Sequence, residues 1–275
     1  MNARKSRSPV WAHAGRMLAL LALCLVALQI VFATRIALMN VVDPQSTAFQ
    51  RSEAWRLLTS QGQILWSQQW ADDAVLSRHL KRAVIASEDA GFVEHPGVEW
   101  EAIEQAWRRN ERAAERAERL AERLAARQSA SQSARQSASQ SAAARAGRPA
   151  RAPKVVGGST ITQQLAKNLL LSGERTVPRK AQELVLALWL ETFLSKQRIL
   201  EIYLNNVEWG EGVFGAQAAS RHYFRVDAAQ LGPAQAARLA VMLPAPKRFE
   251  KNPASVYVSG RAATIVARMG DVQLP

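Results

Sequence analysis

Two adjacent carboxylates, Glu88 and Asp89, end a stretch with apolar residues at helical spacing, and Phe92 and His95 follow them. Partial burial beside an aromatic ring raises the pKa of a carboxyl group toward the range in which a general base works at neutral pH. Glu88 is therefore a candidate general base, although most single glutamates are only solvated residues on a protein surface. His95 is more typical of a packed histidine than of a metal ligand, because no second histidine stands at ligand spacing. No metal site is predicted.

A second group of reactive side chains lies in residues 157–168, which begin with two glycines and end at Asn168. Glycines let a ligand approach the backbone, and exposed N–H groups at a helix start favour phosphate. Thr160 can cap that helix. Thr160, Gln164 and Lys167 recur at i, i+4 and i+7, so a hydroxyl, an amide and an ammonium would line one wall. A capped amphipathic helix with solvated polar residues is the alternative.

Three cations and a carboxylate lie close together between Arg175 and Glu183. Arg179 and Lys180 precede Glu183 by four and three residues, which places them on its helical face. Such a group could hold a pyrophosphate, with Glu183 orienting the cations. Spacing alone leaves an ordinary set of surface ion pairs as the alternative.

These side chains must be positioned by helices, because no convincing run of alternating strand residues appears. A mainly α fold is predicted. Residues 108–127 are rich in Arg, Glu, Ala and Leu, which favours helix. Residues 128–153 consist mostly of Ser, Gln, Ala and Arg, a composition typical of disorder. Residues 108–153 are therefore predicted to be a low-complexity insert within a domain spanning residues 40–275.

The N-terminus predicts a membrane anchor. Residues 1–16 are basic, and residues 17–33 are apolar except for Gln29, close to the length that crosses a bilayer core. The apolar run is longer than in most signal peptides, so an uncleaved helix over residues 17–39 is expected. The positive flank belongs in the cytoplasm, which places residues 40–275 on the other side. The single cysteine, Cys24, lies in this anchor and cannot form an intramolecular disulfide.

The formal charge of +13 fits three kinds of partner: nucleic acid, an anionic membrane surface, or a polyanionic substrate. The aromatic residues lie inside apolar helical runs, whereas single-strand binders interleave them on a basic face. No nucleic-acid partner is expected.

Taken in order, these motifs resemble the family-51 glycosyltransferases, the peptidoglycan polymerases. The matching patterns are E-D-x-x-F-x-x-H-x-G at residues 88–97, G-x-S-T-I-T-Q-Q-x-x-K-N at 157–168, R-K-x-x-E at 179–183 and K-x-x-I-L-E-x-Y-L-N at 196–205. A fifth, weaker pattern covers residues 212–224. The resemblance spans residues 75–255 apart from the insert.

The resemblance implies a lysozyme-like α-helical domain beside the membrane, acting on lipid II, a disaccharide-pentapeptide on polyprenyl pyrophosphate. Glu88 would take the proton from the 4-hydroxyl of the acceptor sugar. That oxygen would attack the anomeric carbon of the lipid-linked strand with inversion, and polyprenyl pyrophosphate would leave. Lys167 and Arg175 would neutralise the leaving group, and Glu183 would complete the catalytic set.

Further residues are implied to bind substrate. They are Asp89, Phe92, Thr160, Gln164, Asn168, Arg179 and Lys180, with the first two supporting the first motif. In the fourth motif, Arg198, Glu201, Tyr203 and Asn205 are implied to be architectural. The candidate cofactor is a divalent cation, Mg²⁺ or Mn²⁺, that accompanies the pyrophosphate, and no organic cofactor is expected.

The implied location is the bacterial inner (plasma) membrane, with a single span, a cytoplasmic N-terminus and a periplasmic catalytic domain. Implied partners are lipid II, the growing glycan strand, the membrane and other cell-wall synthesis proteins. Because no Ser-x-x-Lys or Lys-Thr-Gly motif occurs, a monofunctional enzyme insensitive to β-lactams is expected. Two alternatives stay open: a lytic transglycosylase or muramidase, and a catalytically silent membrane scaffold of cell-wall assembly.

Overall fold

The chain forms two compact units, Met1–Val98 with Thr160–Pro275, and Glu99–Ser159. The computed structural model describes residues 9–99, 159–171 and 176–275, and between the first two ranges residues 101, 104, 105, 108, 111–120, 122 and 123. Residues 111–120 are helical, as their composition predicts. The predicted disorder of residues 128–153 lies outside the described residues, and so does Arg175.

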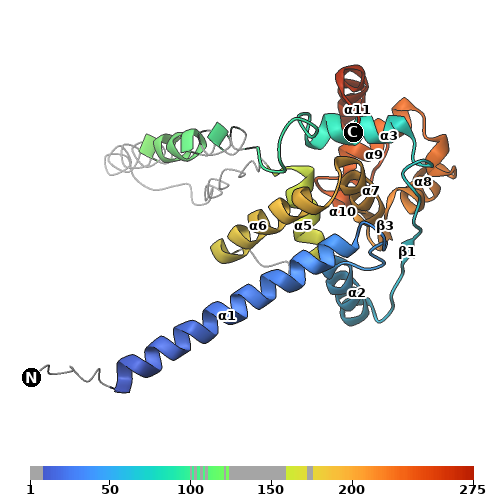
Figure 1. The fold of residues 1–275 in the computed structure, drawn as a ribbon. Coiled ribbons are helices and arrows are strands. Elements are labelled where there is room, and N and C mark those ends of the chain that lie inside the picture. The colour runs from blue at the N-terminus through green and yellow to red at the C-terminus, as the bar shows by residue number, and fades with distance from the viewer. Residues whose placement is uncertain are drawn as a thin grey trace, which may run out of the picture. The chain divides into compact units, whose positions relative to one another are not determined.

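The first unit is mainly α-helical, which confirms the predicted fold class (Figure 1). Its helices are α1 (Pro9–Leu38), α2 (Ala48–Gln61), α3 (Arg78–Glu88), α5 (Ile161–Leu170), α6 (Val177–Phe193), α7 (Lys196–Asn206), α8 (Ala216–Phe224), α9 (Pro233–Met242), α10 (Pro246–Phe249) and α11 (Val256–Arg268), with 3-10 turns at Ala228–Gln230 and Met269–Asp271.

A small sheet accompanies the helices. Strands β1 (Ser67–Gln68), β2 (Glu208–Gly210) and β3 (Val213–Phe214) lie in the order β1-β3-β2, with β1 parallel and β2 antiparallel to β3. The sequence did not predict these strands, because two or three residues are too short to display an alternating pattern.

Hydroxyl side chains cap the N-termini of α5, α6 and α7, the helices that carry the second, third and fourth motifs. Thr160 caps α5, Thr176 caps α6 and Ser195 caps α7, each accepting a hydrogen bond from the backbone N–H three residues later. Such a cap satisfies an N–H that has no partner inside the helix. The helices then pack in pairs around one apolar core, α3 on α9, α9 on α11, and α5 on both α6 and α7.

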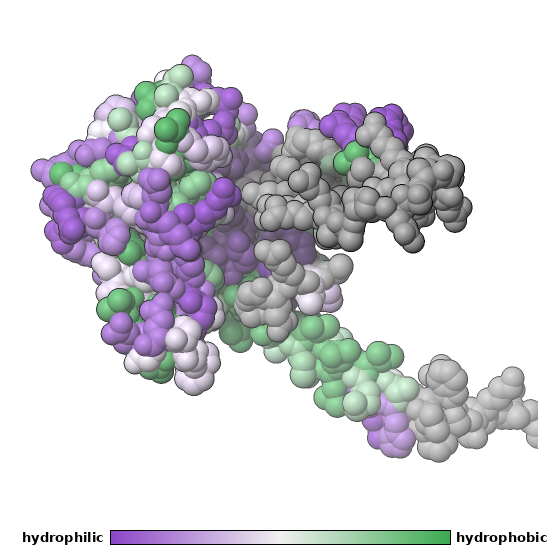
Figure 2. Space-filling view, turned by 180° about the vertical axis from the view of Figure 1, so that it is seen from behind, coloured by the Kyte–Doolittle hydropathy of each residue, from purple (hydrophilic) through white to green (hydrophobic). Residues whose placement is uncertain are grey.

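Helix α1 is long and apolar enough to cross a membrane, over His13–Leu38. Most of its large apolar side chains are exposed in the protein, including Met17, Leu21 and Leu25 (Figure 2). A free surface of this kind is unfavourable in water and favourable in lipid. The helix is thus consistent with the predicted single-pass anchor.

Candidate active site

Glu88 is the last residue of α3 and is half-buried. One carboxylate oxygen, Oε2, accepts a hydrogen bond from Nε2 of Gln164 at 3.0 Å. Burial raises the pKa of Glu88, and the charge of Asp89 adds to the rise, while hydrogen bonds from Gln164 and Ser87 oppose it. The predicted direction of the shift is confirmed. The structure thus joins the first motif on α3 to the second motif on α5.

Tyr203 of α7 orients this contact. Its buried hydroxyl donates to Oε1 of Gln164 at 3.0 Å, which directs the amide nitrogen of Gln164 toward Glu88. Burial, together with the charges of Glu88 and Asp89, holds the pKa of Tyr203 well above its usual value, so the hydroxyl keeps its proton. Tyr203 was expected to be architectural; the structure instead links it through Gln164 to the candidate base.

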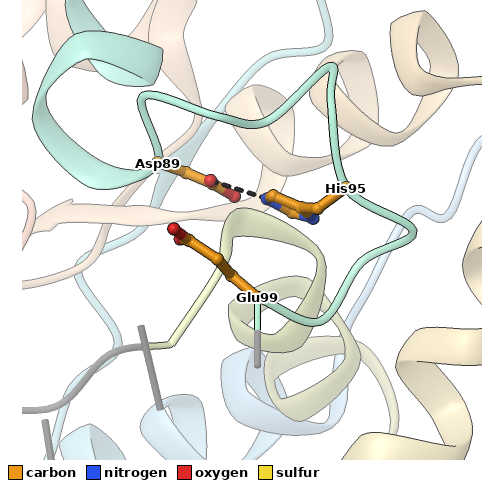
Figure 3. Close-up of side chains that lie close together, drawn as sticks. All are labelled: Asp89, His95 and Glu99. Atoms are coloured by element: carbon orange, nitrogen blue, oxygen red, sulfur yellow. Dashed lines mark hydrogen bonds and ion pairs between the residues drawn. The ribbon is translucent and has the colours of Figure 1, made fainter. Parts of the chain in front are cut away.

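Asp89 is buried and both of its oxygens are engaged inside the protein. Oδ1 pairs with Nε2 of His95 at 2.8 Å (Figure 3), and Oδ2 accepts from the backbone N–H of Ile161 at 2.9 Å. Nδ1 of His95 accepts from the N–H of Gly97 at 3.1 Å, so Nε2 carries the ring hydrogen and donates to Asp89. Glu99, also drawn in Figure 3, begins the second unit. These contacts fix the start of α5 to the first motif, and the expected role of Asp89 in substrate binding stays a prediction.

Thr160 has a similar internal role. Its buried hydroxyl donates to the carbonyl of Gly97 at 2.6 Å and accepts from the N–H of Gln163 at 3.2 Å. Gly97 has a φ of 78°, and a Cβ there would lie 2.5 Å from Cγ of Glu191. Thr160 was expected to line the donor site, but these two bonds occupy its hydroxyl at the helix start.

Lys196, the first residue of α7, joins the first motif to the end of α6 beside Phe92. Its ammonium donates to the carbonyl of His95 at 2.7 Å and to Oε1 of Glu191 at 2.8 Å, and it lies 4.6 Å from the Phe92 ring centre. Phe92 is fully buried, so it packs inside the domain, and its expected role in substrate binding stays a prediction. The sequence contained a signal for Lys196, the first letter of the fourth motif, but Glu191 stands outside every motif.

Helix α6 presents the predicted group of charges. Glu183 is buried, with Oε2 2.9 Å from Nη1 of Arg179 and Oε1 in contact with the ammonium of Lys180. The predicted grouping of these three side chains is therefore confirmed. Arg179 and Lys180 are partly exposed, so both cationic side chains reach the surface of the protein.

Helix α5 connects the two groups. Gln164 reaches Glu88 at one level, and Lys167 is exposed one turn later on the same face, with Asn168 half-buried beside it in sequence. Because α5 packs on α6, a single pair of helices carries the carboxylate contact, Lys167 and the charges around Glu183.

The remaining residues of the fourth motif hold the backbone, as expected. Arg198 donates to the carbonyl of Met39 at 2.8 Å and pairs with Asp43 at 2.6 Å, which ties α7 to the end of α1. Glu201 accepts from the N–H of Asp73 at 2.7 Å. Asn205 bonds both the N–H and the carbonyl of Ala71, at 2.8 and 2.9 Å.

Comparison with known proteins places this arrangement in a family. A model described as transglycosylase matches residues 59–120 and 135–270. A biosynthetic peptidoglycan transglycosylase of Cupriavidus metallidurans is 47% identical over 272 residues, which cover 94% of this chain and 99% of that relative. One of Burkholderia thailandensis is 45% identical over 249 residues, 90% and 82% of the two chains. One of Paraburkholderia phytofirmans is 43% identical over 257 residues, 94% and 91%. The chain belongs to the transglycosylase family.

Proposed function

We propose that this chain is a peptidoglycan glycosyltransferase that transfers a growing lipid-linked glycan strand onto the 4-hydroxyl of a lipid II acceptor. The observation that carries the proposal is the carboxylate of Glu88, half-buried, with a raised pKa, and oriented by the Tyr203–Gln164 pair. Burial leaves such a carboxylate poorly solvated, and a raised pKa makes it a stronger base toward a hydroxyl proton.

In the proposed reaction, Glu88 accepts the proton of the acceptor's 4-hydroxyl. The oxygen forms a bond to the anomeric carbon of the donor as the bond from that carbon to the pyrophosphate oxygen breaks. Inversion needs one base and no covalent intermediate. The polyprenyl pyrophosphate leaves with the bonding electron pair, so negative charge develops on its oxygens. Lys167, Arg175, Arg179 and Lys180 would stabilise that charge, and Glu183 would hold the last two in place.

A divalent cation is a proposed cofactor, but the described residues of the first unit around these motifs do not suit it as fixed ligands. Both oxygens of Asp89 and both ring nitrogens of His95 are engaged internally. Both oxygens of Glu183 contact cations. We therefore assign the cation no ligands on the protein and no step in the reaction; Mg²⁺ or Mn²⁺ would accompany the pyrophosphate as its counter-ion.

The proposed location is the bacterial inner membrane, with the N-terminus in the cytoplasm and the catalytic domain in the periplasm. The charge asymmetry of the anchor's flanks supports this orientation. An anchor of this kind keeps the enzyme in the same two-dimensional layer as its lipid-linked substrate and the growing strand. Other cell-wall synthesis proteins are proposed partners.

The test is to incubate purified full-length protein with labelled lipid II and Mg²⁺ and to separate the products on a gel. Wild type and Glu94→Gln should form polymer, because Glu94 lies in the same motif but is exposed. Glu88→Gln should form none while still binding lipid II.

The same assay separates the alternatives. A lytic enzyme would shorten pre-formed glycan and leave lipid II unused. A silent scaffold would bind lipid II and leave both substrates unchanged, in wild type as in the Glu88→Gln variant. The cations around Glu183 argue against the lytic alternative, because a glycan cleaver has no pyrophosphate to bind.

A further inference from the structure

Gln29 is a polar residue in the second half of the apolar run, and its side chain is turned toward α6. Its Nε2 donates to Oε1 of Gln182 at 3.0 Å, and its Oε1 accepts from Nε2 of Gln182 and from Nε1 of Trp189, both at 3.4 Å. Gln182 and Trp189 lie seven residues apart on α6, so two turns of one helix face meet Gln29. Gln29 and Trp189 are both partly covered, whereas Leu28 and Ile30 are exposed.

A second polar contact joins the same two segments further along the chain. The side chain of Asn40, just after α1, donates to the carbonyl of Phe193, the last residue of α6, at 2.8 Å. Gln29 and Asn40 are eleven residues apart, and so are Gln182 and Phe193. Equal spacing means that α6 runs alongside α1 in the same direction for about 16 Å. The two helices are drawn side by side in Figure 1.

The contact lies within the apolar part of the anchor. Gln29 precedes Ala33, the end of the predicted apolar run, by four residues, which is about 6 Å along a helix. An amide in this environment loses water and needs a hydrogen-bonding partner. Val185 and Leu188 of α6 are exposed large apolar side chains, as expected for a helix that borders lipid. Because α6 runs in the same direction as α1, the docking of Gln182 fixes the start of α6 alongside the apolar part of the anchor.

We propose that Gln29 is a positioning residue, which docks α6 on the anchor and so sets the height at which Arg179 and Lys180 meet a membrane-bound donor. The effect on donor binding rests on the proposed function, whereas the contact between Gln29 and α6 does not. Arg179 and Lys180 precede Gln182 by three and two residues, so the docking of Gln182 fixes both cations relative to the anchor. A lipid-linked pyrophosphate has little freedom in depth, which makes the height of the cations matter for binding.

The contact is tested in bilayers without any substrate. In a Cys24→Ala background, the pair Gln29→Cys and Gln182→Cys is treated with a short bifunctional thiol reagent, and the joined peptides are identified by mass spectrometry. Efficient joining is expected. The matched pair Ile30→Cys and Gln182→Cys should join poorly, because Ile30 is 60% exposed and points elsewhere on α1. Equal yields from the two pairs would overturn the docking.

The consequence is tested with the full chain in proteoliposomes. Gln29→Leu should raise KM for long-chain lipid II about three- to tenfold, the factor that one hydrogen-bonded contact in a membrane contributes. Its kcat, its melting temperature and its activity on a short-chain donor in detergent should stay at the wild-type values. Gln29→Asn, which keeps the amide, should fall between the two. A Gln29→Leu variant with wild-type KM, or one whose kcat falls on both donors, would overturn the positioning role. If wild type makes no polymer, the proposed function fails while the cross-link still reports the docking.

Discussion

Replacing Gln164 with Leu should move the pH dependence of the reaction by acting on Glu88. The substitution removes the amide that donates to Oε2 of Glu88 at 3.0 Å and leaves burial of the carboxylate in place. The hydrogen bond lowers the pKa of Glu88, whereas burial, the largest influence, raises it. Without Gln164 the pKa must therefore rise further.

The size of the shift follows from the energy of one hydrogen bond. A bond to a charged group contributes about 1.5–3 kcal/mol, and one pKa unit corresponds to about 1.4 kcal/mol. Glu88 is only half-buried, so water replaces part of the lost bond and the lower end applies. We expect a rise of about one unit.

The assay is kcat/KM for lipid II polymerisation as a function of pH. Because the base must be ionised, activity rises with pH through its pKa, and the acid limb of Gln164→Leu should lie about one unit higher than that of wild type. Well below both pKa values the variant should be about tenfold slower, and on the plateau the difference should narrow to the loss caused by the missing orienting contact. Tyr203→Phe, which removes only the orienting hydroxyl, should give a smaller shift in the same direction. A variant with an unmoved limb and a uniformly lower plateau would refute the link between Gln164 and the charge of Glu88.

Four further perturbations have expected outcomes. Burial raises the pKa of Glu208 to about 7, so the folded protein keeps this carboxyl group protonated up to about that pH. The contribution of Glu208 to stability is therefore fully present below pH 4.5 and is lost as the pH rises through about 7. Glu208→Gln should match wild type in thermal melts at pH 4.5 and exceed it at pH 8 by at most about 3 kcal/mol; a variant less stable at pH 8 would contradict this. Gly97→Ala should lose about 1–3 kcal/mol of stability and most activity, because its Cβ would meet Glu191, whereas Gly270→Ala should melt like wild type. Glu183→Gln should lower kcat/KM at least about tenfold, since two cations lose their buried partner; a variant within twofold of wild type would reduce the group to surface ion pairs. A chelator should slow polymerisation and added Mg²⁺ or Mn²⁺ should restore it, and full activity without divalent ions would remove the cation from the proposal.

The sequence predicted best what one helix determines. The grouping of Arg179, Lys180 and Glu183 follows from spacing of three and four residues on α6, and the structure has the same pairs. The cap at Thr160 also follows from local chemistry. The mainly α fold follows from helical periodicity in the motifs.

The sequence could not predict contacts that packing creates between distant segments. Nothing in the chain order indicates that Gln164 reaches Glu88 or that Tyr203 orients Gln164, because these contacts join α3, α5 and α7. For the same reason Asp89 was expected at the substrate, although it bonds the N–H of Ile161, 72 residues away. Phe92 was expected beside the substrate, although it is buried under Lys196. Asp89 and Phe92 follow the end of α3, where no helical periodicity indicates which side chains the fold covers.

The central claim is that Glu88 activates an acceptor hydroxyl against a lipid-linked donor. The most direct measurement counts polyprenyl pyrophosphate released from labelled lipid II per glycosidic bond formed, in wild type and in Glu88→Gln. We predict one pyrophosphate for each bond in wild type, and neither pyrophosphate nor bonds in Glu88→Gln at undiminished lipid II binding. Release of pyrophosphate without new bonds, or equal turnover by the two proteins, would contradict the claim.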